Sequence, residues 1–145
     1  MLILQLCLLG RDYLAAAQAG KGAVHFWAVR KEGAPLHRAF AMEPLCALAG
    51  APSGSLVAGG GQSGAAYVWE SASGRLLRAW PAGYKAITAL AFSDDGSLLL
   101  TGGEDTSVAC WNLARLPPFF NFVGCHRRSI ITVYDTMCYN KMLSC

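Results

Sequence analysis

The chain has 145 residues, a mass of 15.4 kDa and a formal net charge of +3, with 54% hydrophobic and 14% charged residues. This composition argues against a disordered polymer, and the basic residues are too scattered to form the dense positive face of a nucleic-acid-binding module. No apolar run reaches the roughly eighteen residues that a membrane-spanning helix needs. We therefore expect one ordinary domain that binds neither nucleic acid nor a membrane directly.

The first predicted element is the apolar run Met1–Leu9, which we interpret as a buried strand. A signal-peptide core is the alternative, but no lysine or arginine precedes the run, and Arg11 and Asp12 follow it at once. Three of the six cysteines lie in strand-like apolar runs, and no Cys-x-x-Cys pair occurs. Buried free thiols fit a reducing intracellular compartment. The three cysteines are Cys7, Cys46 and Cys110.

The elements that follow repeat with a fixed period, which is marked by tryptophans. The spacing from Trp27 to Trp69 and from Trp69 to Trp111 is 42 residues in both cases. Each tryptophan ends a similar apolar phrase, and further short apolar runs keep the same register between Gly-, Asp-, Ser- and Pro-rich turns. Such runs predict antiparallel strands and hairpins rather than helices. In chain order the other runs are Tyr13–Ala17, Pro35–Phe40, Leu45–Leu48, Ser55–Ala58, Arg75–Trp80, Ile87–Phe92 and Ser97–Thr101.

This combination resembles the WD40 repeat, although the Trp-Asp dipeptide of that repeat is here Trp-Ala, Trp-Glu and Trp-Asn. The resemblance covers residues 1–115 and implies an all-β fold, a partial WD40 β-propeller of about three four-stranded blades. Seven blades of this period would need about 294 residues, so we expect a ring that is not closed. The terminal blades should then present open edges and exposed apolar faces.

The resemblance also implies a hydrogen-bond network that links a turn aspartate, a strand Ser or Thr, a histidine and the tryptophan of a blade. In the third unit Asp105, Thr101 and Trp111 fill three of these places, and Tyr84 stands where the histidine would be. A buried indole N–H needs an acceptor, and a turn carboxylate accepts backbone N–H groups. The second unit has Gln62-Ser63 instead of the aspartate, so we expect its network to be weaker or absent.

Finer features are similar to one group of WD-repeat proteins, the WD-repeat subunit of the rixosome. They lie in Gly59–Glu70, Ser73–Leu77 and Gly83–Leu90. This resemblance implies a scaffold, truncated here, in the nucleoplasm and nucleolus, with ribosome-assembly factors as partners. It also implies a role in pre-rRNA processing and large-subunit biogenesis, with a link to pre-replicative complexes and DNA replication. A WD40 adaptor of another complex, in ubiquitin ligation or chromatin, is the alternative.

In such a fold the strand-connecting turns form two rims, where partner proteins dock. We expect Tyr84, Lys85 and Gln62 to be the partner contacts, and the plain alternative for each is a solvated turn. One rim should carry Gln62, Ser63, Tyr84, Lys85, Glu104 and Asp105, and the other Ser73, Gly74, Asp94 and Asp95.

No motif predicts catalysis. Gly59-x-Gly61-x-x-Gly64 has the spacing of a dinucleotide fingerprint, but a strand follows it where that motif needs a helix, so it reads as a hairpin turn. Asp94 and Asp95 lie in a turn, where aspartate is ordinary. We therefore expect no enzyme, no cofactor, no metal site and no small-molecule substrate.

Residues 116–145 form a predicted non-repeat tail. Pro117-Pro118 cannot continue a central strand, and we expect the fourth strand of the third unit to be missing. Phe119–Val123 and Ser129–Asp135 are β-prone but fit no register of the repeat. We interpret the tail as an aberrant end, from intron read-through or an alternative exon. A real but divergent tail is the alternative.

Overall fold

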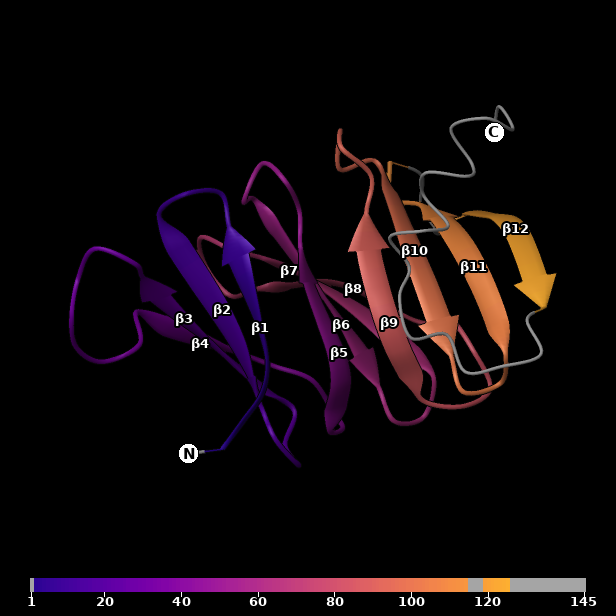
Figure 1. Ribbon diagram of the computed structural model, residues 1–145, viewed down its shortest axis with the longest axis horizontal. Coiled ribbons are helices and arrows are strands. Elements are labelled where there is room, and N and C mark those ends of the chain that lie inside the picture. Colours follow the sequence, from indigo (N-terminus) through magenta and orange to yellow (C-terminus); the bar gives the residue numbers. More distant parts are fainter. Residues whose placement is uncertain (1, 115–118, 126–145) are drawn as a thin grey trace.

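The computed structural model describes residues 2–114 and 119–125, and these form an all-β fold. Their strands make three antiparallel sheets, as the sequence predicts, and each sheet has four strands (Figure 1). The first sheet consists of β1 (Ile3–Leu9), β2 (Tyr13–Gln18), β3 (Ala23–Ala28) and β4 (His37–Phe40). The second consists of β5 (Leu45–Gly50), β6 (Leu56–Gly61), β7 (Ala65–Glu70) and β8 (Leu76–Pro81). The third consists of β9 (Ile87–Phe92), β10 (Leu98–Gly103), β11 (Ser107–Asn112) and β12 (Phe119–Cys125).

In every sheet the strands lie side by side in chain order, and each strand pairs antiparallel with its neighbours. The first strand of the second sheet, β5, contacts both β1 and β9. The three sheets therefore follow one another like successive blades of a propeller, and Figure 1 shows them arranged along the long axis. The tryptophans that mark the repeat lie on the third strand of each sheet, β3, β7 and β11.

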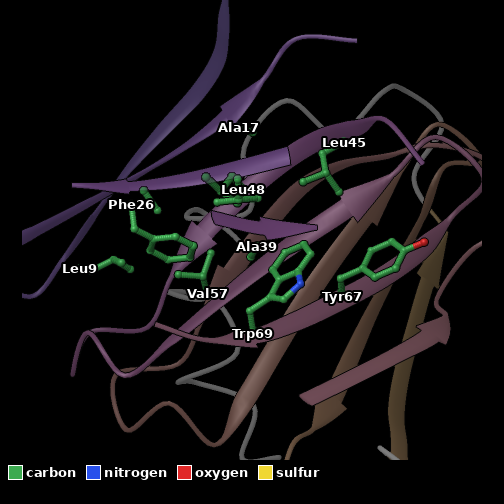
Figure 2. Packing of buried hydrophobic residues seen from close by; sticks show 11 residues of the cluster. Leu9, Ala17, Phe26, Ala39, Leu45, Leu48, Val57, Tyr67 and Trp69 are labelled. Atoms are coloured by element: carbon green, nitrogen blue, oxygen red, sulfur yellow. The ribbon is translucent and has the colours of Figure 1, made fainter. Parts of the chain in front are cut away.

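The larger hydrophobic core lies between the first and second sheets (Figure 2). Phe26 and Leu9 from the first sheet pack into one cluster with Leu48, Val57 and Trp69 from the second. The Trp69 side chain has no exposed surface. Because the strands alternate inward and outward side chains, each sheet can present one apolar face to the preceding sheet and one to the next.

The same packing recurs between the second and third sheets. Trp111 and Leu99 of the third sheet pack against Ala58 and Val68 of the second. Trp80 on β8 meets Trp111 edge to face, with ring centroids 5.7 Å apart. The repeated tryptophan therefore faces the preceding sheet at both interfaces, which explains why the period of the sequence equals the period of the packing.

The face of the first sheet that points away from the second is open. Leu6 is 56% exposed, whereas Leu48, its equivalent 42 residues later, is 4% exposed because the first sheet covers it. Leu8 is also exposed, and Trp27 is only half-buried. Met1–Leu9 therefore contains the predicted strand, but the prediction that this strand is buried is wrong. Trp27 likewise differs from the core position we expected for it, because no preceding sheet covers its ring.

The outer face of the third sheet differs from that of the first. Leu100, Val108 and Cys110 form a third cluster there, and all are buried. The expectation of exposed apolar faces therefore holds for the first sheet and is wrong for the third.

The third sheet also corrects the prediction for the chain beyond Arg115. Residues 119–125 form β12, which pairs antiparallel with β11 from Ser107↔Cys125 to Asn112↔Phe119. The third unit thus has the fourth strand that we expected to be missing. Its pairing is displaced by two residues from the 42-residue register, because Cys110 pairs with Phe122 whereas the equivalent Val68 pairs with Arg78. The expectation that Phe119–Val123 fits no register of the repeat is therefore confirmed. The sheet extends into the segment predicted as a tail from residue 116. Ser129–Asp135 and the rest of 126–145 lie outside the described residues.

Candidate interaction surface

The loops at one end of the strands form a continuous band, which we call the Tyr84 rim. It consists of residues 19–22, 41–44, 62–64, 82–86 and 104–106. Backbone hydrogen bonds join neighbouring loops of this band. The Gln62 N–H donates to the Pro44 carbonyl (3.1 Å), the Gly83 N–H to the Gly64 carbonyl (2.9 Å) and the Glu104 N–H to the Ala86 carbonyl (3.0 Å). The loops of the rim are therefore held together by backbone hydrogen bonds and do not form separate turns.

Two large side chains project from the Tyr84 rim into solvent. Met42 is 96% exposed and Tyr84 is 95% exposed, and they occupy equivalent positions 42 residues apart. Lys85 and Gln62, the other two expected contacts, are exposed on the same rim. Tyrosine and methionine are enriched at protein–protein interfaces relative to the rest of a protein surface. Sequence reasoning missed Met42, although the repeat register places it at the position of Tyr84.

Asp105 fixes the backbone from which Tyr84 projects. Its Oδ2 accepts the Tyr84 N–H (2.9 Å), and its Oδ1 accepts the Ser107 N–H (3.0 Å) and the Ser107 hydroxyl. Burial alone would raise the pKa of Asp105, but these hydrogen bonds together lower it below its ordinary value of 3.8. The carboxylate thus ties the turn between β10 and β11 to the loop between β8 and β9.

The tryptophan of the third sheet has its own acceptor. The Trp111 indole N–H donates to the Thr101 hydroxyl oxygen (3.0 Å), and both groups are buried. The structure therefore brings together Thr101 with Trp111 and Asp105 with Tyr84, as two adjacent pairs. Tyr84 takes part through its backbone, because its side chain points into solvent.

In the second sheet the indole N–H of the tryptophan has a different acceptor. Gly59 stands where the third sheet has Thr101, so it offers no hydroxyl, and a Cβ there would lie 2.7 Å from the Trp69 ring. The indole fills that space and donates its N–H to the Phe40 carbonyl of the first sheet (3.2 Å). The tryptophan is satisfied across the sheet interface instead of within its own sheet.

The missing turn aspartate is also replaced. Ser63 stands where the third sheet has Asp105, and the carboxylate comes from Glu43, in the facing loop. The Glu43 oxygens accept the Ser63 N–H (2.6 Å), the Ser63 hydroxyl (2.6 Å) and the Tyr67 hydroxyl (3.1 Å). Our expectation of a weak or absent network in the second unit is therefore wrong. The carboxylate has moved to the other loop of the pair, and Lys85 is the equivalent of Glu43 at the next interface.

Acid should weaken the Asp105 contacts. A carboxyl group whose pKa is lower in the folded protein than in the unfolded chain stabilises the folded protein at pH values above its unfolded-state pKa. This stabilisation is lost as the pH falls through the pKa that the group has in the folded protein. We expect Asp105→Ala to cost about 1–2 kcal/mol near neutral pH and progressively less below about pH 4. Urea unfolding of both proteins across this range measures the difference, with Asp94→Ala, at an exposed turn, as the control. A difference that did not shrink in acid would contradict the role of the ionised carboxylate.

The opposite rim carries the other predicted turns. The loops 51–55, 71–75 and 93–97 lie there, with Ser73, Gly74, Asp94 and Asp95. The Asp95 carboxylate accepts the Ser93 and Ser97 hydroxyls and the Ser97 N–H, and these hydrogen bonds lower its pKa to about 2. Asp95 therefore closes its own hairpin, which is a structural task.

Metal ligands and thiols are the remaining candidate reactive groups among the described residues. In this part of the chain no group of three His, Cys, Asp or Glu side chains is placed to hold a metal ion. Cys7 and Cys46 are half-buried rather than fully buried as expected, and Cys110 is buried. Burial raises the pKa of Cys7 to about 12 and also raises that of Cys46, so neither thiol is readily ionised. No helix of the described residues is long and apolar enough to span a membrane.

Comparison with known proteins agrees with this architecture. Residues 74–112 match the family model described as WD domain, G-beta repeat. The fold is similar to that of a chain in a structure titled "Crystal Structure of Mitotic Checkpoint Complex", with a TM-score of 0.78. That match has 22% sequence identity and covers 90% of this chain and 41% of the other. The chain is a WD40-repeat protein, and it has the predicted fold of a partial β-propeller.

Its relatives lie in the group that the sequence resembles. It is 39% identical over 111 residues to Protein ROOT INITIATION DEFECTIVE 3 of Arabidopsis thaliana, which covers 74% of this chain and 25% of that protein. It is 31% identical over 108 residues to WD repeat-containing protein 18 of Homo sapiens, with the same two coverages. The Pre-rRNA-processing protein IPI3 of Mycosarcoma maydis is 35% identical over 99 residues, 68% of this chain and 17% of that protein. The matched region thus spans a quarter or less of each relative.

Proposed function

We propose that this chain is a non-catalytic protein-interaction scaffold that acts in pre-rRNA processing and biogenesis of the large ribosomal subunit. Its site of action is the nucleus, in the nucleoplasm and nucleolus, and its partners are ribosome-assembly factors. They dock on the Tyr84 rim through Met42, Tyr84, Lys85 and Gln62. No cofactor or small-molecule substrate takes part.

One observation carries the binding part of this proposal. Met42 and Tyr84 are almost fully exposed at equivalent positions, and the loops that hold them are tied by Glu43 and Asp105. A partner that covers the two side chains gains their apolar contact area without having to order the backbone beneath them. Aromatic and methionine side chains are enriched at such interfaces.

The cellular part rests on the relatives. One is named as a pre-rRNA-processing protein, and the chain is also similar to WD repeat-containing protein 18. The family model and these relatives describe repeat and pre-rRNA-processing proteins, not an enzyme family. The link to DNA replication stays a prediction, because none of these names concerns replication.

The proposal is tested with the tagged chain expressed in cells and its Met42→Ala/Tyr84→Ala double variant. We expect the tagged chain to sediment with precursors of the large subunit and to co-purify with precursor rRNA. The double variant should lose most of this association, at least about fivefold, because it removes both exposed anchors and leaves the core intact. Asp94→Ala, on the opposite rim, should behave like the unchanged protein.

Two results would contradict the proposal. If the unchanged chain stayed out of the precursor fractions and co-purified with ubiquitin-ligase subunits or histones, the role in ribosome assembly would be wrong. If the double variant bound as well as the unchanged chain, the rim would not be the docking surface.

A further inference from the structure

A cavity of about 580 Å³ lies between the first and second sheets, at the end of the strands opposite the Tyr84 rim. We call it the His37 pocket. Tyr13, Leu36 and Leu77 line it and are each nearly half-exposed, so part of its apolar wall faces solvent. The cavity is within the size range of ligand sites, and its lining has their usual character of an apolar wall with few polar groups. The other apolar side chains in the lining are Phe26, Leu56 and Ala72.

The next sheet interface shows what the chain itself places at this position. Phe26 and Val68 are equivalent residues 42 positions apart, and the strand pairing sets His37 opposite Phe26 and Arg78 opposite Val68. His37 donates from Nε2 to the Ser71 carbonyl of the following sheet (2.7 Å). Arg78 donates from Nη1 to the Leu113 carbonyl, which is the equivalent of Ser71.

The two interfaces therefore share one cross-sheet hydrogen bond but use side chains of different length. At the second interface a long arginine crosses between the sheets. At the first a short histidine makes the bond with its ring stacked on Phe26, at a centroid distance of 4.6 Å, and the cavity lies beside it. The first interface has thus kept the bond and left space that a longer side chain could occupy.

The side chains that line the His37 pocket indicate which kind of group it can bind. Glu70 is the one carboxylate in the lining, and its Oε2 accepts the Ser73 hydroxyl. A carboxylate at the edge of an apolar wall matches a cation carried on an apolar stem, and the guanidinium of arginine also stacks on aromatic rings such as Tyr13. A leucine-sized side chain next to the arginine would cover Leu36 and Leu77.

We propose that the His37 pocket binds a short segment of a partner protein in which a leucine-like side chain lies next to an arginine. The apolar side chain fills the cavity between Leu36 and Leu77, and the guanidinium pairs with Glu70. This site is separate from the Tyr84 rim and does not depend on a role in ribosome assembly.

The test is an NMR titration of the ¹⁵N-labelled full chain with three peptides, Gly-Leu-Arg-Gly, Gly-Leu-Glu-Gly and Gly-Ser-Arg-Gly. We expect Gly-Leu-Arg-Gly to shift the amide signals of Leu56 and Ser71 in a saturable way. The other two peptides should bind at least about fivefold more weakly, because each lacks one of the two matched groups. Glu70→Gln should remove the preference for the arginine peptide over the glutamate peptide.

Three variants separate the site from general effects on folding. His37→Arg copies the second interface, so it should keep the bond to Ser71 and the thermal stability while weakening the arginine peptide about tenfold. Leu77→Gln removes part of the wall at an exposed position, and Leu76→Gln changes the neighbouring exposed residue, which does not line the pocket. The first of these should weaken binding and the second should not.

The proposal is overturned by any of three results. The glutamate peptide could bind as tightly as the arginine peptide, the shifts could fail to saturate up to about 10 mM, or a folded His37→Arg protein could bind with unchanged affinity. None of these results bears on the Tyr84 rim, so failure here and failure of the proposed function are distinguishable.

Discussion

Replacing Trp69 by alanine is expected to lower the free energy of unfolding by about 3–5 kcal/mol, the usual cost of removing a large aromatic side chain from a core. The ring has no exposed surface and lies at the centre of the cluster that joins the first and second sheets (Figure 2). Its indole also donates to the Phe40 carbonyl, which would lose its partner. Gly59, directly under the ring, cannot fill the cavity that remains.

Trp27→Ala is the matched control for this prediction. Trp27 has the same place in its repeat, but no preceding sheet covers it, and its ring stacks on His25 at a centroid distance of 5.7 Å. We expect its loss to cost about 1–2 kcal/mol, because less surface is removed from contact. Urea unfolding of the two variants measures both values. Equal costs would show that the Trp69 ring is not held by the sheet interface.

The comparison of these tryptophans shows what the sequence could and could not predict. The 42-residue period placed every strand from β2 to β11, because a repeated apolar phrase must be buried in a repeated way. It could not tell a covered repeat from an uncovered one. Trp27 and Trp69 have the same local sequence pattern. Their burial differs because the first sheet covers Trp69, whereas no sheet of the described residues precedes the one that carries Trp27.

The hydrogen bonds of the turn carboxylate and of the tryptophan could be predicted from the sequence for the third unit but not for the second. Asp105 and Thr101 match the pattern that the resemblance implies, whereas Gly59 and Ser63 do not. The replacement by Glu43 could not be seen from the motif, because the carboxylate comes from the loop on the other side of the contact. The contact between two facing loops needs one carboxylate, which either loop can supply. The sequence motif covers only the loop that carries Asp105 in the third unit, so it cannot reveal a carboxylate on the other loop.

Two features, the strand β12 and the equivalence of His37 and Arg78, follow from the pairing of the backbone and could not be predicted from the pattern of side chains. β12 follows Pro117-Pro118 without the apolar phrase of a fourth strand, yet it pairs with β11 through backbone hydrogen bonds, which any sequence except proline can make. His37 and Arg78 are equivalent by pairing but only 41 residues apart. The 42-residue period therefore does not identify these two residues as equivalent, whereas the pairing of the strands does.

Gly64→Ala is expected to lower the free energy of unfolding by about 2–5 kcal/mol. Gly64 has a φ of 95°, in the left-handed region that costs other residues about 1–2 kcal/mol. A Cβ would also lie 2.2 Å from the Gly83 carbonyl oxygen and 2.8 Å from that of Lys85. These are backbone atoms, so the loop that carries Tyr84 would have to move, and the hydrogen bonds from Ala82 and Gly83 to the Gly64 carbonyl would lengthen.

Gly96→Ala separates the two causes. Gly96 has a φ of 73°, and a Cβ there would meet no atom within 4 Å, so only the backbone term applies and the expected cost is about 1–2 kcal/mol. Thr106, the equivalent of Gly64 in the third sheet, adopts a φ of 66° with a side chain, which shows that this backbone shape alone is tolerated. Thermal unfolding of both variants measures the difference. If Gly64→Ala cost no more than Gly96→Ala, the tight contact between the two loops would be wrong, and the Tyr84 rim would not be the rigid surface on which its proposed role in binding depends.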